Sequence, residues 1–80
     1  MATTQAGVVS AAVAYTRKYG GRRATVHNRT GAGKLIVEGT ATLVGCKLVD
    51  VLHDMSLWRV QFVGGDCVVE RWIFDGDIEQ

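Results

Sequence analysis

The stretch that decides the fold runs from Leu57 to Phe74 and reads LWRVQFVGGDCVVERWIF. In its first part Trp58, Val60 and Phe62 are apolar, and the residues between them are polar. Alternation with a period of two is the pattern of a half-buried strand. The glycine pair that follows, at residues 64–65, predicts a tight turn, so the whole stretch is predicted to form a β-hairpin.

The returning strand of this hairpin, residues 67–74, is apolar on both faces. Val68 and Trp72 fall on one face, whereas Val69 and Ile73 fall on the other. A strand that is apolar on both faces is typically buried on both. We therefore expect it to be central in the sheet, or to have its outer face covered by a helix or by a partner.

The region before the hairpin is predicted to add three strands, at residues 24–27, 34–46 and 47–53. The second is long, and Gly39 within it predicts a bulge or a sharp bend. The chain ends in an acidic segment, residues 75–80, which we expect to form a turn and a frayed end.

The first part of the chain, residues 4–19, is predicted to form a helix. Alanines are frequent there, apolar side chains recur at helical spacing, and two glycines follow at once, as is typical of a helix end. The competing interpretation is a strand over residues 8–15, because Val and Tyr are common in strands. The apolar stripe of the helix consists of Val8, Ala12, Tyr15 and Tyr19.

The opposite side of this helix carries small residues instead of charged ones. Gly7, Ala11 and Ala14 lie there, and Ser10 is the only polar side chain between residues 6 and 14. A helix that is apolar all round is normally covered on more than one side. We therefore predict that Gly7, Ala11 and Ala14 contact a second copy of the protein.

One helix followed by about five bent antiparallel strands predicts the α+β class, with the strands forming a small, partly open barrel. The 80 residues form a single domain, with the barrel region at residues 23–74. The segment GTATLV at residues 39–44, together with the hairpin at 57–74, resembles SH3-like barrels of the Tudor and KOW kind. This resemblance covers about half of the chain, and it implies a fold without implying a function.

The charges are unevenly distributed along the chain, although the net charge is only +1. Residues 1–37 carry six basic side chains and no acidic one, whereas residues 38–80 carry three basic and eight acidic side chains. An exposed basic group would bind phosphate or an acidic protein. The competing interpretation is that the acidic half of the same domain covers it. The predicted basic group consists of Arg17, Lys18, Arg22, Arg23, Arg29 and Lys34.

The sequence TGAGKL at residues 30–35 contains the Gly-Lys pair of a phosphate-binding loop, but its other parts are missing. The loop requires a glycine five residues before Gly33, where this chain has Asn28, and a Ser or Thr after Lys34, where it has Leu35. Strand-forming residues follow where a helix would begin. We interpret the segment as a glycine turn that starts a strand, and we expect no nucleotide.

A metal site would have to use His27, His53, Cys46 and Cys67, none of which are paired at the close spacing of structural zinc ligands. The cysteines are predicted to be small core residues, and we expect neither a metal nor another cofactor.

His53 and Asp54 form the one candidate catalytic pair in the sequence, but neighbouring residues of a strand point to opposite faces. We therefore expect no enzymatic activity.

These observations favour a non-enzymatic, oligomeric protein that binds a protein partner in the cytoplasm. Its apolar run at residues 6–14 is far shorter than the roughly 20 residues that span a bilayer, and no basic residue precedes it as in a signal peptide. Two alternatives stay open. One is a nucleic-acid-binding module that uses the basic group, and the other is an enzyme or ligand site at an oligomer interface lined by His27 or His53.

Overall fold

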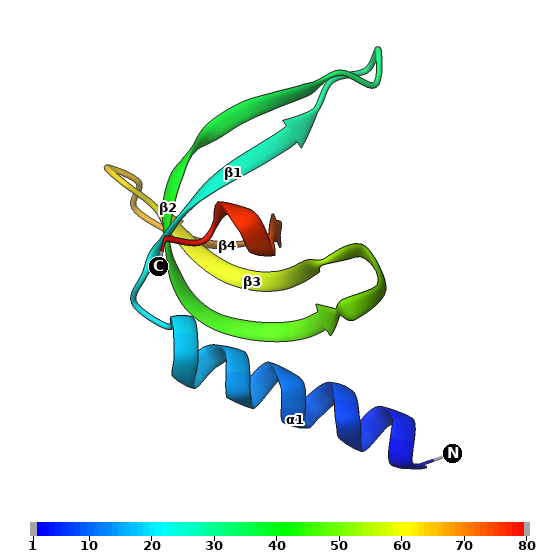
Figure 1. The fold of residues 1–80 in the computed structure, drawn as a ribbon. Coiled ribbons are helices and arrows are strands. Elements are labelled where there is room, and N and C mark those ends of the chain that lie inside the picture. Colours follow the sequence, from blue (N-terminus) through cyan, green and yellow to red (C-terminus); the bar gives the residue numbers. More distant parts are fainter. Residues whose placement is uncertain (1, 80) are drawn as a thin grey trace.

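The computed structural model describes the backbone of residues 2–79 and the side chains of residues 11–79. A helix precedes four antiparallel strands in the spatial order β1-β2-β3-β4. Figure 1 shows this sheet curled into a half-barrel, with the helix along one side. The elements in chain order are α1 (Ala2–Tyr19), β1 (Arg23–Arg29), β2 (Leu35–Asp50), the 3-10 turn η1 (Val51–His53), β3 (Met55–Phe62), β4 (Val68–Phe74) and the 3-10 turn η2 (Asp75–Asp77).

The α+β class is confirmed, but the expected number of about five strands is wrong. The segments 34–46 and 47–53, predicted as two strands, largely form the single strand β2, which has 16 residues and continues to Asp50. Two bulges bend this strand without ending it, because Val44 and Lys47 each stand as an extra residue against β3. The turn η1 follows, and the Asp50 side chain caps it.

A third bulge lies nearer the start of β2, where the sequence predicted one. Gly39 pairs with Val26, and Val37 pairs with the next residue of β1, so Glu38 is the extra residue. A Cβ atom at Gly39 would lie only 3.3 Å from Cδ1 of Phe62. The missing side chain therefore lets β2 pass close to this aromatic ring.

The core lies inside the half-barrel and receives residues from all four strands. Trp58 and Val60 are fully buried, as their alternation predicted. Ser56 is buried beside them, and its Oγ accepts a hydrogen bond of 2.8 Å from Nε1 of Trp58, which satisfies the buried indole N–H. The buried cluster consists of Ala24, Val26, Ala41, Leu43, Trp58, Val60, Ile73 and Ile78.

Strand β4 is the last strand in the sheet order, so the prediction that it is central is wrong. Its inner face carries the buried Ile73, whereas Val68 and Trp72 on its outer face are exposed. The helix packs against β2 and leaves these two side chains uncovered. The apolar outer face of β4 is therefore part of the molecular surface.

The acidic tail is part of the folded sheet, so the prediction that it frays is wrong for residues 75–79. After η2, Ile78 forms a β-bridge with Ala24 and is buried. The amide nitrogen of Glu79 donates a hydrogen bond of 2.9 Å to the carbonyl oxygen of Arg23. The end of the chain thus pairs with the first strand and closes the half-barrel on that side.

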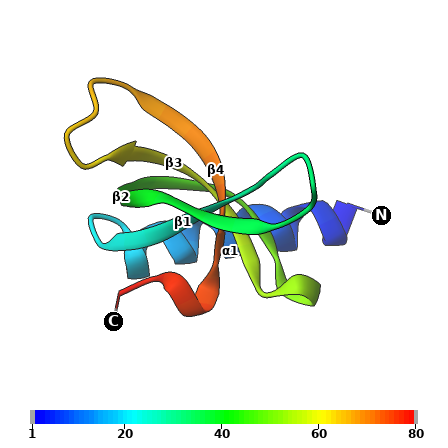
Figure 2. The same cartoon turned by 90° about the horizontal axis from the view of Figure 1, so that it is seen from above.

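The end of α1 covers the edge of β2 that β1 leaves free beyond residue 42. The carbonyl oxygen and amide nitrogen of Leu43 each form a hydrogen bond of 2.8 Å with the segment 21–22, and the amide nitrogen of Cys46 donates to Oγ1 of Thr16 at 3.0 Å. Figure 2 shows the helix lying beside this part of the sheet. Covering a free edge in this way satisfies its backbone groups and protects it from pairing with other strands.

The glycine pair after α1 ends the helix as predicted. A Cβ atom at Gly20 would collide with the carbonyl oxygen of Thr16, and Gly21 has a φ of +85°, in the left-handed region. The next residues must turn sharply here so that they reach Leu43. Both glycines are therefore required by the connection between α1 and β1.

We predict that Gly21→Ala lowers the free energy of unfolding by about 1–2 kcal/mol, because an L side chain is strained in the left-handed conformation. Denaturant unfolding followed by tryptophan fluorescence would measure the change. Gly31→Ala is the matched control, since a Cβ atom added at Gly31 would meet no other atom within 4 Å and its φ is not positive. Equal stability of the two variants would contradict the prediction.

Candidate interaction surfaces

The structure divides the six predicted basic residues into two groups. Four lie where α1 ends and β1 begins, and two lie at the far end of the β1–β2 hairpin (Figure 1). Strand β1 has seven residues, and at a rise of about 3.3 Å per residue its ends are about 20 Å apart. That distance exceeds the Debye length at physiological salt, so the groups act separately. They are the helix-end cluster (Arg17, Lys18, Arg22 and Arg23) and the arm pair (Arg29 and Lys34).

All six basic side chains are exposed, and within residues 11–79 none of them forms an ion pair with a carboxylate. Their contacts are with backbone or ring atoms. Arg22 Nη1 donates to the carbonyl oxygen of Glu79 at 3.2 Å, and Arg29 Nη1 donates to that of Gly33 at 2.8 Å. A carbonyl leaves the positive charge of its donor uncompensated, so both groups are accessible to an external anion.

The carboxylates of the acidic tail meet other partners. The hydroxyl of Tyr15 donates a hydrogen bond of 3.0 Å to Oδ2 of Asp75. Oδ2 of Asp77 lies 3.0 Å from Nδ1 of His27, a close electrostatic contact without hydrogen-bond geometry. Among the described side chains, the tail therefore contacts a tyrosine and a histidine and does not neutralise the basic group.

The pKa values of two side chains near Asp75, those of Tyr15 and Cys46, are raised. Burial, and then the hydrogen bond to Asp75, raise the pKa of Tyr15 to about 12. Burial also raises the pKa of the Cys46 thiol to about 11, and the charge of Asp75 adds to that shift. Both groups remain protonated at neutral pH, so neither is an activated nucleophile.

The β1–β2 hairpin projects beyond the rest of the sheet as a two-stranded arm, residues 28–37 (Figure 1). Strand β3 pairs with β2 only from Ala41 onward, so no third strand supports the arm. Leu35, Ile36 and Val37 are consequently exposed, Val37 to 62%. The arm also carries the arm pair and no acidic residue. It is therefore an apolar and positively charged projection.

The turn between β2 and β3, residues 50–54, is a second apolar projection, and we call it the acidic turn because two of its residues are aspartates. Leu52 is 87% exposed and Val51 is 74% exposed. Oδ2 of Asp50 lies 2.8 Å from Nδ1 of His53, and the hydrogen bond to His53 lowers the pKa of the Asp50 carboxyl. Asp50 is thus kept ionised beside two exposed aliphatic side chains.

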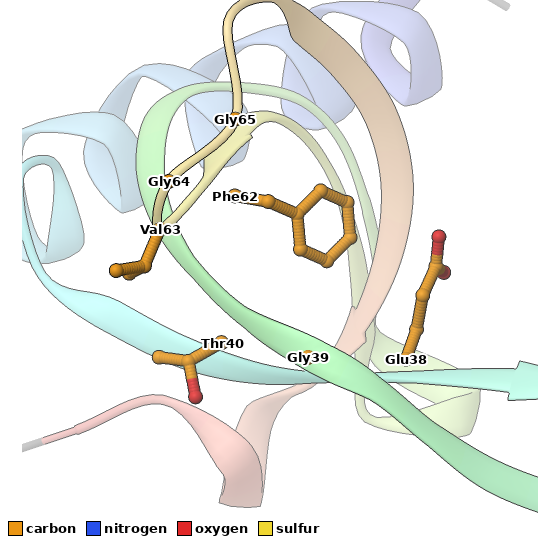
Figure 3. A pocket seen from close by; sticks show the side chains of 7 residues that line it. All are labelled: Glu38, Gly39, Thr40, Phe62, Val63, Gly64 and Gly65. Carbon is orange, nitrogen blue, oxygen red and sulfur yellow. The ribbon is translucent and has the colours of Figure 1, made fainter.

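A pocket of about 390 Å³ opens between β2 and the turn that joins β3 to β4. Figure 3 shows the Phe62 ring pointing into it, with Glu38 at its side. The Arg71 guanidinium holds the Glu38 carboxylate through two hydrogen bonds of 3.2 Å. Neither His27 nor His53 lines this pocket. It therefore offers no free acid or base, and it does not supply the histidine-lined site of the enzyme alternative.

The histidines and cysteines lie in separate places. Within the described part of the chain, no three His, Cys, Asp or Glu side chains gather closely enough to hold a metal ion. Cys46 is half-buried against the core, but Cys67 is exposed in the turn before β4, so its prediction as a core residue is wrong. His53 pairs with Asp50 and not with Asp54, because a 3-10 turn replaces the predicted strand.

The helix presents its predicted apolar stripe to the sheet. Ala12 is buried, and Tyr15 and Tyr19 pack against the core. On the predicted oligomer-contact side, Ala14 is exposed and Ala11 is half-buried. The remaining residues of the two predicted sets, Val8 and Gly7, lie outside the described side chains.

The acidic turn is the surface that the sequence-based reasoning missed. The sequence pattern predicts a strand at Val51 and Leu52, where an aliphatic pair is ordinary. The available signal was the spacing of Asp50 and His53, because an Asp that accepts a hydrogen bond from the backbone three residues later is typical of a capped turn.

Over residues 2–79, the structure contains no helix that is both long and apolar enough to cross a membrane. Comparison of the chain with known protein families, with curated proteins and with solved structures finds no match. The resemblance to SH3-like barrels therefore stays a prediction.

We predict that stability falls as the pH rises from 10 to 12, in part through Tyr15. Its pKa is raised in the folded protein, so the stabilisation is complete below the ordinary value of 10 and is lost as the pH approaches about 12. Tyr15→Phe should flatten the plot of unfolding free energy against pH in this range. Tyr19→Phe is the control, since the Tyr19 hydroxyl makes no hydrogen bond to a described residue. A Tyr15→Phe plot parallel to that of the wild type would contradict the prediction.

Proposed function

We propose that this chain is a non-enzymatic protein-binding module that acts through the apolar surface of its arm and its acidic turn. The observation that carries the proposal is the exposure of Leu35, Ile36 and Val37 on a two-stranded arm, with which no third strand pairs among residues 2–79. A contiguous apolar projection of this kind is covered by another protein more readily than by a polar ligand.

The distribution of apolar residues over the described part of the chain supports this proposal. Nine hydrophobic residues are buried, whereas eleven large hydrophobic residues are exposed. Isolated exposed aliphatic residues are normal on protein surfaces, but here three are consecutive on the arm and two are consecutive in the acidic turn. This surplus is the feature that binding to a protein would explain.

Other features support the fold and the cellular location that we propose. The curled antiparallel order and the bridge between Ala24 and Ile78 support an SH3-like barrel. Both cysteines are free and Cys67 is exposed, which fits a reducing compartment such as the cytoplasm.

The test replaces the three arm residues together, as Leu35→Thr, Ile36→Thr and Val37→Thr. Threonine keeps the strand preference, and the side chains are exposed, so we expect a nearly unchanged melting temperature. The protein, labelled on Cys67, should diffuse as a complex in an extract of its native cells, and the variant should diffuse as a free chain of 8.7 kDa. Equal diffusion of both proteins in the extract would reject the proposal. Val26→Thr, a core substitution, is the control that should lower the melting temperature.

A nucleic-acid-binding module is the second candidate, and the helix-end cluster favours it. Its four cations are exposed without a carboxylate partner in the described residues. When the phosphates of a nucleic acid bind such a cluster, condensed counterions are released, so the affinity falls as the salt concentration rises. Tyr15 and Tyr19, the aromatic residues next to this cluster in the sequence, are packed against the core and do not offer free rings for stacking on bases.

For this second candidate we predict that log K for a DNA duplex falls with log salt with a slope of about −3 to −4, one phosphate for each of four cations. Arg17→Gln with Arg23→Gln should reduce the slope by about 2. Fluorescence anisotropy at several salt concentrations would measure it. Arg59→Gln, on the exposed side of β3, should leave the slope unchanged. A flat salt response of the wild type would reject nucleic-acid binding.

A further inference from the structure

The structure also indicates what the protein partner is. Resting on the protein-binding function proposed above, we infer that the partner is a second copy of this chain. The arm of each copy contacts the acidic turn of the other, so one twofold-symmetric dimer contains the same contact twice.

The placement of the two projections supports a reciprocal contact. Figure 1 shows the tip of the β1–β2 hairpin and the β2–β3 turn projecting from the same side of the molecule, and Figure 2 shows the same arrangement from above. Within one copy, no ion pair joins the two projections among residues 11–79. A twofold axis that enters this side places each arm on the opposite turn, and such an isologous contact closes at two copies.

The charges of the two projections are complementary. The arm carries Arg29 and Lys34 without an acidic residue, whereas the acidic turn carries Asp50 and Asp54 without a Lys or Arg. Two arm–turn contacts therefore bring opposite charges together twice. A nucleic acid would match the arm but would be repelled by the turn, so a second copy fits the whole surface better than a polyanion does.

The apolar residues of the two projections are also complementary. Leu35 and Val37, which lie on one face of the arm, would cover Val51 and Leu52 of the other copy, and all four are exposed in a single copy. The two projections include fifteen residues per copy (28–37 and 50–54), fewer than the roughly 20–30 residues per side of a standard interface. We therefore expect a dimer that dissociates at micromolar concentration and not a permanent one.

The experiment uses two variants whose charges are reversed at sites that keep the turn contacts intact. The arm variant carries Lys34→Glu and Val37→Glu, and the turn variant carries Val51→Lys, Leu52→Lys and Asp54→Asn. Asp54 has a φ of 53°, in the left-handed region that Asn tolerates as Asp does, so the turn is kept. Arg29 and Asp50 are retained, because their side chains hold the local backbone. Sedimentation velocity from about 1 μM to about 1 mM measures the dimer, and melting temperatures check that each variant is folded.

We expect the wild type to dimerise, and each variant alone to dimerise at least about tenfold more weakly, because like charges meet at both contacts. An equimolar mixture of the variants should recover a dimer close to wild-type affinity, since both of its contacts then join opposite charges. The control Arg59→Glu, on the outer side of β3, should dimerise like the wild type. A variant that fails to fold is replaced by its single substitution, Lys34→Glu or Leu52→Lys, with the same expectation.

Several results would overturn the dimer. These are a wild type that stays monomeric up to about 1 mM, variants that dimerise as well as the wild type, a mixture that stays monomeric, or assembly that continues beyond two copies. A wild type that is monomeric in buffer but bound in the cell extract would overturn the dimer and leave the protein-binding function standing. Free diffusion in both media would overturn both.

Discussion

Strand β2 changes its partner along its length, and the rest of the structure depends on this change. Its first part pairs with β1 and its later part pairs with β3, so only Ala41 and Thr42 have a strand partner on both sides. Where β1 ends, the helix covers the vacant edge at Leu43 and Cys46. Where β3 ends, the amide nitrogen of Val63 still donates to the carbonyl oxygen of Thr40, but over residues 2–79 no strand pairs with this edge of residues 35–39, and β2 continues as the arm. One bent strand therefore creates both the closed end of the core and the exposed projection.

The predicted basic residues stay without carboxylate partners among the described residues, because the carboxylates of the acidic tail contact other side chains. Ile78 and Glu79 pair with the start of β1 through their backbone, which brings the acidic segment beside the helix end. The side chains of Asp75 and Asp77 are then directed to Tyr15 and His27. Backbone pairing thus fixes where the acids lie, and the basic residues remain on the surface in two groups separated by the length of β1.

The sequence predicts those features that depend on local periodicity and turn chemistry. The alternation around Trp58 identifies the inner face of β3, the glycine pair ends the helix, and Gly39 marks a bulge. Periodicity does not show whether another strand lies beside a segment. Nor does it show that the bulge at Glu38 changes the parity of β2. It assigns Leu35 and Val37 to the same face as the buried Ala41, whereas they pair with Arg29 and His27 on the opposite face of an arm without a third strand.

The predicted boundary between the strands 34–46 and 47–53 is wrong for a different reason. Bulges at Val44 and Lys47 shift the register without interrupting the strand, so the change of parity resembles a strand boundary that does not exist.

Strand preference accounts for aliphatic residues on the arm, because Ile and Val favour strands whether or not they are covered. It does not account for Val51 and Leu52, which lie in a 3-10 turn and face solvent. Neither local structure nor core packing requires aliphatic residues there, so their exposure is the part of the proposed interface that strand preference does not explain.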